Sequence, residues 1–189
     1  MSINREQWLN LAVDKLRTEL FLPVGETVPV VRVSIGFPKG SARKIIGQFW
    51  PCEAVNDNTA AVFISPTLED PIRILDVLAH ELVHSIVPSA GHGKAFKRIA
   101  LAIGLTGKMT ATVAGEELAT RLNIMADELG PLPQSAINLG KSPTKKQGTR
   151  LIKVTCSDCG YIARTTRKFL DLTGAPLCAC NSEPMKEGK

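Results

Sequence analysis

All three histidines of this 189-residue chain lie within thirteen positions, and a glutamate directly follows the first of them. The segment reads HELVHSIVPSAGH and contains His80, Glu81, His84 and His92. On a helix, residues i and i+4 lie on one face, so His80 and His84 can offer two imidazole nitrogens to one ion. Glu81 lies close enough to hydrogen-bond a metal-bound water. This is the H-E-x-x-H arrangement of zinc peptidases, in which the glutamate is the general base.

A catalytic zinc ion typically has three protein ligands and one open position, so a third ligand is needed. His92 is the remaining histidine. Pro88 ends the helix, and Gly91 and Gly93 flank His92, so the chain can reverse and bring this imidazole toward the ion. Three imidazoles with an open position favour zinc over harder ions. The pattern also arises by chance, but its context here indicates a metal site.

Peptide-bond hydrolysis is the chemistry expected of such a site. Zinc lowers the pKa of its water toward neutrality and polarises a substrate carbonyl. Glu81 accepts the proton of the water and passes it to the leaving amine. The expected enzyme is a zinc metalloendopeptidase, with Glu81 as its catalytic residue.

Four of the five cysteines form a second cluster near the C-terminus. Cys156-Ser-Asp-Cys159 is followed, after eighteen residues, by Cys178-Ala-Cys180. Paired thiolates at both ends of a short β module are typical of a structural zinc ribbon with four cysteine ligands, in which the metal supplies most of the folding free energy. The second pair has one intervening residue where two are usual, so unmetallated thiols or a redox pair remain alternatives. Cys52 stands apart and is expected to be a small buried hydrophobic residue.

Clear end signals delimit the helix that carries the histidine pair. Asp70 is a candidate N-cap, Pro71 occupies the first helical position and Pro88 stops the helix, which predicts a helix over 71–87. Much of its buried surface is expected from Ile72, Leu75, Val83 and Ile86. Three further helices are predicted over residues 4–21, from near Gly93 to Gly104, and over 116–129. The apolar face of the first is expected to contain Trp8, Leu11, Ala12, Leu16 and Leu20.

Three β-type runs lie between the first two helices, over residues 28–37, 44–50 and 60–66. The breaks between them, PKGS and NDNT, indicate turns and suggest an antiparallel meander. Residues 130–149 are rich in Pro, Gly, Ser and Lys without an apolar period. The predicted organisation is a domain over 1–130, a flexible basic linker over 131–149 and a small β-rich module over 150–189.

The basic charge of the chain is concentrated in its last fifty residues. The formal net charge is +5, and residues 140–189 contain ten Lys and Arg against four Asp and Glu. This asymmetry indicates either a polyanionic partner such as DNA or RNA, or a solvated basic surface. No stretch has the roughly 20 consecutive apolar residues of a membrane span, and the N-terminus lacks a signal-peptide pattern. The expectation is a cytoplasmic protein without membrane contact, and a monomer by default.

Cations and aromatic residues are mixed around the predicted ribbon. This mixture is suited to contacting a phosphate backbone and stacking on bases. In the alternative, the aromatic residues form the core of the module and the cations keep it soluble. The residues concerned are Tyr161, Arg164, Arg167, Lys168 and Phe169, of which the three cations are the candidate nucleic-acid contacts.

HELVH followed by GHGKAFK resembles the SprT-like metallopeptidases, over roughly residues 5–125. The resemblance implies an α+β, zincin-like domain with a helix, a small antiparallel sheet, the HExxH helix and further helices, followed by a zinc ribbon. It implies that His80, His84 and His92 bind the catalytic zinc, that Glu81 is the base, and that Phe96 is a packing residue. RKIIGQFWP, FISPTLEDP and the cysteine-bearing tail are most similar to small SprT-like proteins of phages and bacteria, which would place the chain in a host cytoplasm if phage-encoded.

Three functions follow from these patterns. The first is a zinc endopeptidase acting on DNA-associated proteins, because eukaryotic members of the family cleave proteins crosslinked to DNA. The second is a non-catalytic zinc-binding adaptor of the transcription machinery, since some similar proteins are labelled transcription elongation proteins. The third is a general degradative peptidase with no role at nucleic acid. Glu81 distinguishes the first two, because hydrolysis requires it and zinc binding does not.

Overall fold

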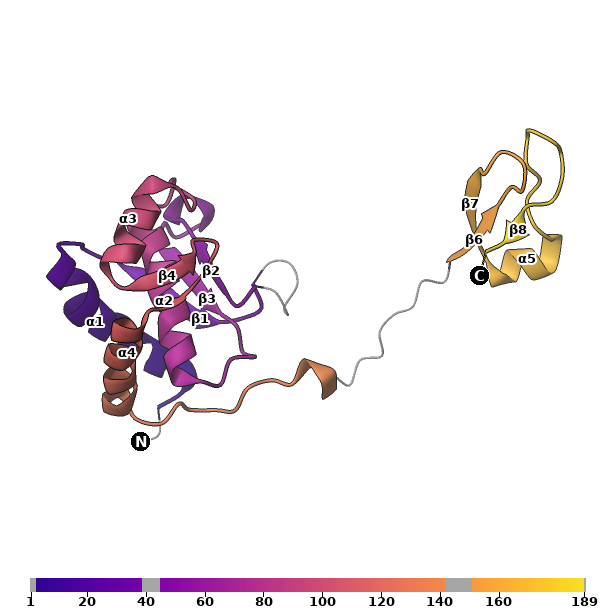
Figure 1. The fold of residues 1–189 in the computed structure, drawn as a ribbon. Helices are drawn as coiled ribbons and strands as arrows, with labels where there is room; N and C mark the ends of the chain where they lie inside the picture. Colours follow the sequence, from indigo (N-terminus) through magenta and orange to yellow (C-terminus); the bar gives the residue numbers. More distant parts are fainter. Residues whose placement is uncertain (1–2, 39–44, 142–150, 189) are drawn as a thin grey trace. The chain divides into compact units, whose positions relative to one another are not determined.

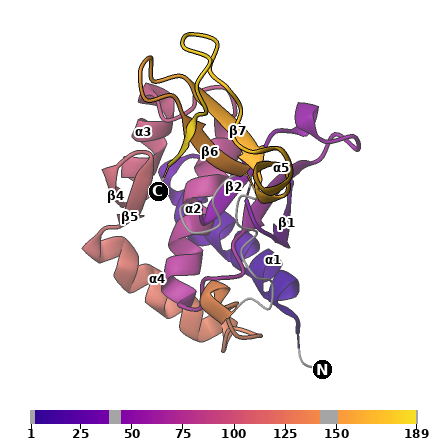
Figure 2. The ribbon, with the colours of Figure 1, turned by 90° about the vertical axis from the view of Figure 1, so that its right-hand side faces the viewer.

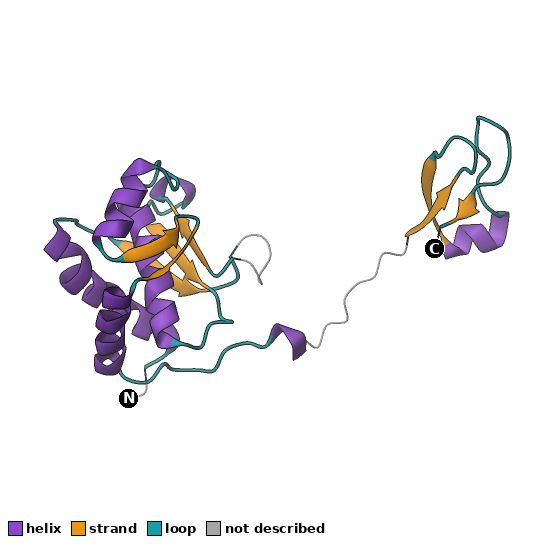
Figure 3. Cartoon of the chain, viewed as in Figure 1, coloured by secondary structure: helices purple, strands orange, loops and turns teal. Residues whose placement is uncertain are grey.

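The computed structural model of this protein describes residues 3–38, 45–141 and 151–188 (Figure 1). The chain divides into two units, Met1–Lys141 and Ser142–Lys189, and each has its own hydrophobic core. Both units combine helices with small sheets (Figure 3), so the predicted α+β class is confirmed. In the described ranges, no helix is long and apolar enough to cross a membrane.

The first unit begins with an amphipathic helix, α1 (Arg5–Leu16). The Asn4 side chain caps it by accepting from the Gln7 backbone N–H, and the Gln7 side chain accepts from the Asn4 N–H, which is a capping box. A π-helical turn, η1 (Arg17–Phe21), and a 3-10 turn, η2 (Leu22–Val24), extend it. Leu11, predicted on the apolar face, is exposed. The buried face consists of Arg5, Trp8, Leu9, Ala12, Val13, Leu16, Leu20 and Phe21.

The three predicted strands form one sheet, but with different neighbours from those predicted. They are β1 (Val31–Ile35), β2 (Gly47–Trp50) and β3 (Ala60–Ile64). The order is β1-β3-β2, with β1 parallel and β2 antiparallel to β3, so the predicted antiparallel meander is wrong. The turn residues indicate breaks between the strands. They do not specify which strands pair with each other. β3 lies in the centre because it is the most apolar of the three and a central position buries the most side-chain surface.

Helix α2 is the element on which the site depends. The remaining elements of this unit are α2 (Pro71–Ile86), α3 (Lys94–Ala102), β4 (Leu105–Lys108), β5 (Ala111–Ala114) and α4 (Glu116–Leu129). The helices predicted over 71–87, from near Gly93 to Gly104 and over 116–129 are therefore confirmed. The antiparallel β4–β5 hairpin was not predicted. α2 packs against α1, α3 and α4 and against strands β2, β3 and β5 (Figure 2). Its neighbours therefore enclose it on several sides.

The first unit extends beyond the predicted domain boundary at residue 130. The Trp8 indole N–H donates to the Gly130 carbonyl at 3.2 Å, and the Ile137 N–H donates to the Pro66 carbonyl at 2.9 Å. A short 3-10 turn, η4 (Leu139–Lys141), ends the unit. The rest of the predicted linker, residues 142–149, lies outside the described residues.

The second unit is a three-stranded antiparallel sheet with one helix. Its elements are β6 (Leu151–Thr155), β7 (Ile162–Thr166), α5 (Arg167–Thr173) and β8 (Lys186–Glu187), with the sheet order β7-β6-β8. α5 was not predicted. The buried core is limited to Val154, Cys156, Cys178 and Met185, with Ala163 and Leu170 packed against it. Two of the four core residues are cysteines, so little apolar surface is available to stabilise this unit.

Candidate metal centres

Helix α2 places His80 and His84 on the same face. Asp70 caps the helix by accepting from the Ile72 N–H at 3.0 Å, and Pro71 occupies its first turn. The two imidazole rings lie 5.1 Å apart between centroids, as expected for residues one helical turn apart. The start of the helix is therefore encoded by its own sequence, and the spacing of the two histidines follows from it.

His92 lies in the turn between α2 and α3 and completes a cluster of three imidazoles. Gly91 has φ +51°, a left-handed conformation that glycine adopts without strain, and this turn reverses the chain. The Nε2 atom of His92 lies 3.2 Å from that of His84 and 3.3 Å from that of His80. Two nitrogen ligands of a tetrahedral zinc ion lie about 3.4 Å apart. The three Nε2 atoms therefore fit one ion, and these residues could hold it.

Phe96 of α3 packs beneath the three imidazoles. Its ring centroid lies 4.9 Å from that of His80, 4.5 Å from that of His84 and 5.0 Å from that of His92. Phe96 is fully buried. It contacts all three rings and carries no reactive atom, which agrees with the packing role that the family resemblance implied.

Burial favours the neutral form of the histidines, which is the form that binds metal. Desolvation, with the charges of the other two histidines as a smaller cause, lowers the pKa of His80 to about 3. Desolvation lowers the pKa of His84 to about 4 and also lowers that of His92. The imidazoles are therefore unprotonated at neutral pH without any metal, and little proton release is needed when an ion binds.

Glu81 is the most buried ionisable group of the cluster. It is 7% exposed, and this burial raises the pKa of its carboxyl group to about 8. A hydrogen bond from the Phe49 backbone has a smaller effect in the opposite direction. Gly47 of β2 faces the same side chain, because a Cβ at this position would lie 2.6 Å from Glu81 Oε1. A glutamate with a pKa near neutrality is suited to both accepting and donating a proton.

A cavity of about 480 Å³ opens beside the histidines. Its walls come from the residues before and within β2, from α2 and from the β4–β5 hairpin. The lining includes Ile45, Ile46, Gly47, Gln48, Phe49, Arg73, Asp76, His80, Glu81, His84, His92, Thr110 and Thr112. Apolar side chains share this wall with converging polar and ionisable groups, which is typical of a ligand-binding site.

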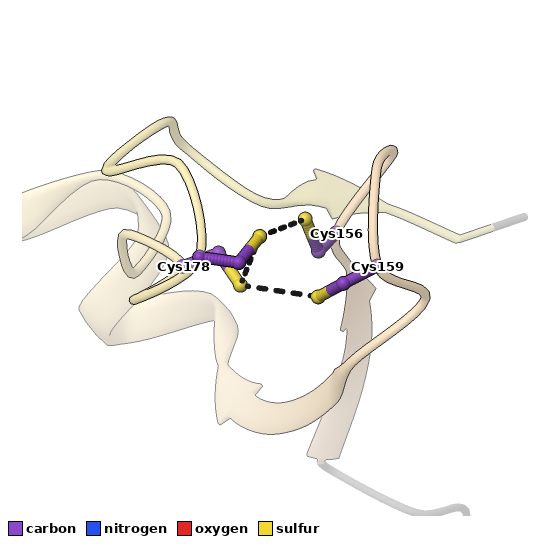
Figure 4. Close-up of side chains that lie close together, drawn as sticks. Cys156, Cys159 and Cys178 are labelled. Atoms are coloured by element: carbon purple, nitrogen blue, oxygen red, sulfur yellow. Dashed lines mark hydrogen bonds between the residues drawn. The ribbon is translucent and has the colours of Figure 1, made fainter.

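The four C-terminal cysteines converge in the second unit. Figure 4 shows the sulfur atoms of Cys156, Cys159 and Cys178 directed toward one another. The Sγ–Sγ distances are 3.6 Å between Cys156 and Cys180, 3.5 Å between Cys159 and Cys178, and 3.4 Å within the Cys178–Cys180 pair. These exceed the roughly 2.05 Å of a disulfide and approach the roughly 3.8 Å between sulfur ligands of tetrahedral zinc. The short second pair therefore does not prevent all four thiols from facing one ion.

The turn after β6 favours a thiolate at Cys156. The backbone N–H groups of Cys159 and Asp158 lower the pKa of Cys156 to about 6, and the Asp158 N–H lies 3.4 Å from its sulfur. Thiolate is the form that binds metal. Cys52, the fifth cysteine, lies in the short turn η3 (Cys52–Ala54) of the first unit, and it is half-buried and takes no part in either cluster.

The predicted nucleic-acid residues differ in their surroundings. Arg167 forms ion pairs with Asp171 and Glu187, whereas no described acidic residue pairs with Arg164 or Lys168. The aromatic residues do not form the core of the second unit, since Tyr161 is 62% and Phe169 is 53% exposed.

Several residues that contact the histidine cluster and Glu81 were not predicted from the sequence. Thr112 contacts His80 from the β4–β5 hairpin, and Gly47 and Phe49 contact Glu81 from β2. A glycine inside an apolar strand run signals close approach of another group, so Gly47 could have been identified from the sequence. Thr112 carries no such signal, because a single threonine in a strand is ordinary.

In comparisons of the chain with known proteins, no protein-family model, no curated protein and no solved structure matches it.

Proposed function

We propose that the first unit is a zinc-dependent endopeptidase. The observation that carries this proposal is the convergence of three imidazole Nε2 atoms at 3.2–3.3 Å beside the buried carboxyl group of Glu81, in an open cavity. A structural zinc site has four protein ligands, whereas this cluster offers three and is accessible to solvent. The HELVH and GHGKAFK segments support membership of the SprT-like family.

Each group of the site has a role in the proposed reaction. His80, His84 and His92 would hold the zinc ion, which when bound polarises a carbonyl and lowers the pKa of a water. Glu81 takes the proton from the attacking water and returns it to the leaving amine. Burial raises the pKa of Glu81 toward neutrality in the metal-free chain, and a bound zinc ion would favour the carboxylate form that accepts the proton.

The position of β2 at the edge of the sheet favours an extended peptide as the substrate. β2 is an edge strand, and its residues line the cavity. The Ile46 carbonyl accepts from the Ser65 N–H, so alternation along the antiparallel ladder directs the backbone groups of Gly47 and Phe49 away from β3. The Phe49 N–H already donates to the Glu81 carboxyl group, so an extended peptide can pair with the backbone groups of Gly47 and with the Phe49 carbonyl.

Metal content and peptide hydrolysis together test this function. We expect two zinc ions per chain, falling to one in His84→Ala and to one in Cys159→Ala. Glu81→Gln should keep both ions and lose hydrolysis of an unfolded protein substrate by roughly 10²–10⁴-fold. Glu69→Gln is the matched control, because Glu69 is exposed and lies outside the cavity at the histidines. Unchanged biological function in Glu81→Gln would support the non-catalytic adaptor instead.

The ribbon supports a polyanionic partner, through a different set of cations from that predicted. Lys153 and Arg164 are paired across β6 and β7, and Thr155 is paired with Lys186 of β8, so these cations share one face of the sheet. All three are exposed, and no acidic residue of the three strands lies on this face. Lys153 and Arg164 repel each other, and phosphate groups would relieve this repulsion. We propose that this face brings the peptidase to DNA-associated proteins.

A further inference from the structure

Thr112 is a buried polar residue that the proposed reaction does not use. It lies on β5, is 3% exposed, and its Oγ1 atom lies 2.8 Å from Nδ1 of His80. It is thirty-two positions from His80 in the chain and comes from a different element. The hairpin therefore brings a hydroxyl group to the imidazole on the side away from the cluster of Nε2 atoms.

The same helix also holds the backbone of Thr112. The Arg73 guanidinium donates to the Thr112 carbonyl at 3.3 Å and to Asp76 Oδ2 at 2.5 Å. Arg73 and Asp76 lie on α2, as His80 does, and Asp76 is 5% exposed. Two hydrogen bonds therefore connect Thr112 to α2, one through its carbonyl and one through its hydroxyl. Together they fix its position relative to His80.

His80 is the one histidine of the cluster with a hydrogen-bond partner outside it, among the described residues. The rings of His84 and His92 contact each other, His80 and phenylalanines. A hydroxyl that accepts from Nδ1–H keeps the proton on Nδ1 and leaves the Nε2 lone pair for a metal ion. The opposite tautomer would place a hydrogen atom among the three Nε2 atoms.

We propose that Thr112 is a positioning residue, whose hydroxyl accepts from Nδ1–H of His80 in the metal-binding tautomer and fixes the orientation of the ring, and that Arg73 and Asp76 hold it there. This inference rests on the proposed metal site. Partners of this kind typically change metal affinity by 10–100-fold when they are removed. The unpredicted β4–β5 hairpin thereby becomes part of the metal centre.

Cobalt(II) binding to the full chain tests the role of Thr112 without any activity assay. Thiolate ligands give intense charge-transfer absorption and imidazoles do not, so titration against a competing chelator measures the two sites separately. Thr112→Val keeps the shape of the side chain and removes the hydroxyl, and it should weaken the histidine site by roughly 10–100-fold. Thr112→Ser should restore the affinity. The control, Thr106→Val on β4, should bind as the wild type, because the Thr106 hydroxyl donates to the Val113 carbonyl and not to a histidine.

The outcomes distinguish this inference from the proposed function. Equal affinity of Thr112→Val and the wild type, or a Thr112→Ser variant as weak as Thr112→Val, would overturn the positioning role. A wild-type chain that binds cobalt only at the cysteines would overturn the metal site itself. If Thr112→Val does not fold, Thr112→Ala is measured in its place, and the same comparison with Thr112→Ser decides.

Discussion

At the scale of single residues, the site combines neutral imidazoles with a carboxyl group whose charge is disfavoured by burial. Metal binding requires unprotonated imidazoles, and burial favours this form because it lowers the pKa of each histidine. Glu81 lies beside these histidines, and burial raises the pKa of its carboxyl group. The same desolvation therefore prepares the ligands and tunes the base, since burial disfavours both the imidazolium cation and the carboxylate anion.

Glu81 should make the metal-free protein less stable as the pH rises. Its pKa is about 8 in the folded chain and about 4.5 ordinarily, so folding disfavours the ionised form. The free energy of unfolding is then lost progressively as the pH rises from about 4.5 through about 8. Glu81→Gln cannot ionise, so its stability advantage over the wild type should grow across this range, to the order of a few kcal/mol.

Urea unfolding of both chains with a metal chelator, at pH 5 and pH 8.5, measures this difference. Trp8 and Trp50 both belong to the first unit and are the two tryptophans of the chain, so their fluorescence reports on that unit alone. The histidine contributions are common to both chains and cancel. A difference that stays constant between the two pH values would contradict the raised pKa of Glu81.

At the scale of elements, α2 supplies the ligands and its neighbours supply their surroundings. β2 contacts Glu81, the β4–β5 hairpin contacts His80, and α3 carries Phe96 beneath the rings. The helix itself is predictable because its cap, first-turn proline and apolar positions are local. The contacts from the strands are not, because they depend on which strand lies against the helix.

Gly47→Ala should disturb the contact between β2 and α2. The added methyl group would lie 2.6 Å from Glu81 Oε1 and 2.6 Å from Val77 Cγ1, which is closer than atoms pack. We expect a loss of about 1–3 kcal/mol in the free energy of unfolding and a lower hydrolytic rate.

The double variant Gly47→Ala, Val77→Ala should recover part of that stability, because it removes Val77 Cγ1, one of the atoms that the methyl group meets. Tryptophan fluorescence during urea unfolding measures both chains and the Val77→Ala single variant. Additive effects of the two substitutions would show that the contact between Gly47 and Val77 is not the cause.

At the scale of the whole molecule, the described part of the chain carries two candidate metal clusters, one in each unit. The histidine cluster lies in a unit with a large apolar core, whereas the cysteine cluster forms much of the core of its own unit. We therefore expect metal removal to leave the first unit folded and to unfold the second unit, since the second unit has little else to stabilise it. Far-ultraviolet circular dichroism and tryptophan fluorescence, recorded before and after chelation, measure the two responses separately.

The sheet of the second unit carries Lys153, Arg164 and Lys186 on one face. Removal of these cations should weaken binding to a mixed-sequence single-stranded oligonucleotide. Lys153→Ala with Arg164→Ala should lower the affinity and reduce the slope of log affinity against log salt by about 0.7 for each phosphate group that is no longer neutralised. Arg167→Ala is the matched control, because Asp171 and Glu187 already neutralise Arg167. Fluorescence anisotropy at several salt concentrations measures both. A control variant as weak as the double variant would contradict the assignment of this face.

The sequence by itself determined the parts of this protein that are local in the chain. His80, His84 and His92 come together because a helix repeat and one tight turn connect them, and the cysteine pairs are each close in sequence. The capping box of α1 and the cap and first-turn proline of α2 are likewise local signals. Only the tertiary structure decided the order of the strands, the contact of Thr112 with His80 and the ion pairing of Arg167. These contacts join residues far apart in the chain, so they depend on how whole elements pack, which no local pattern of residues encodes.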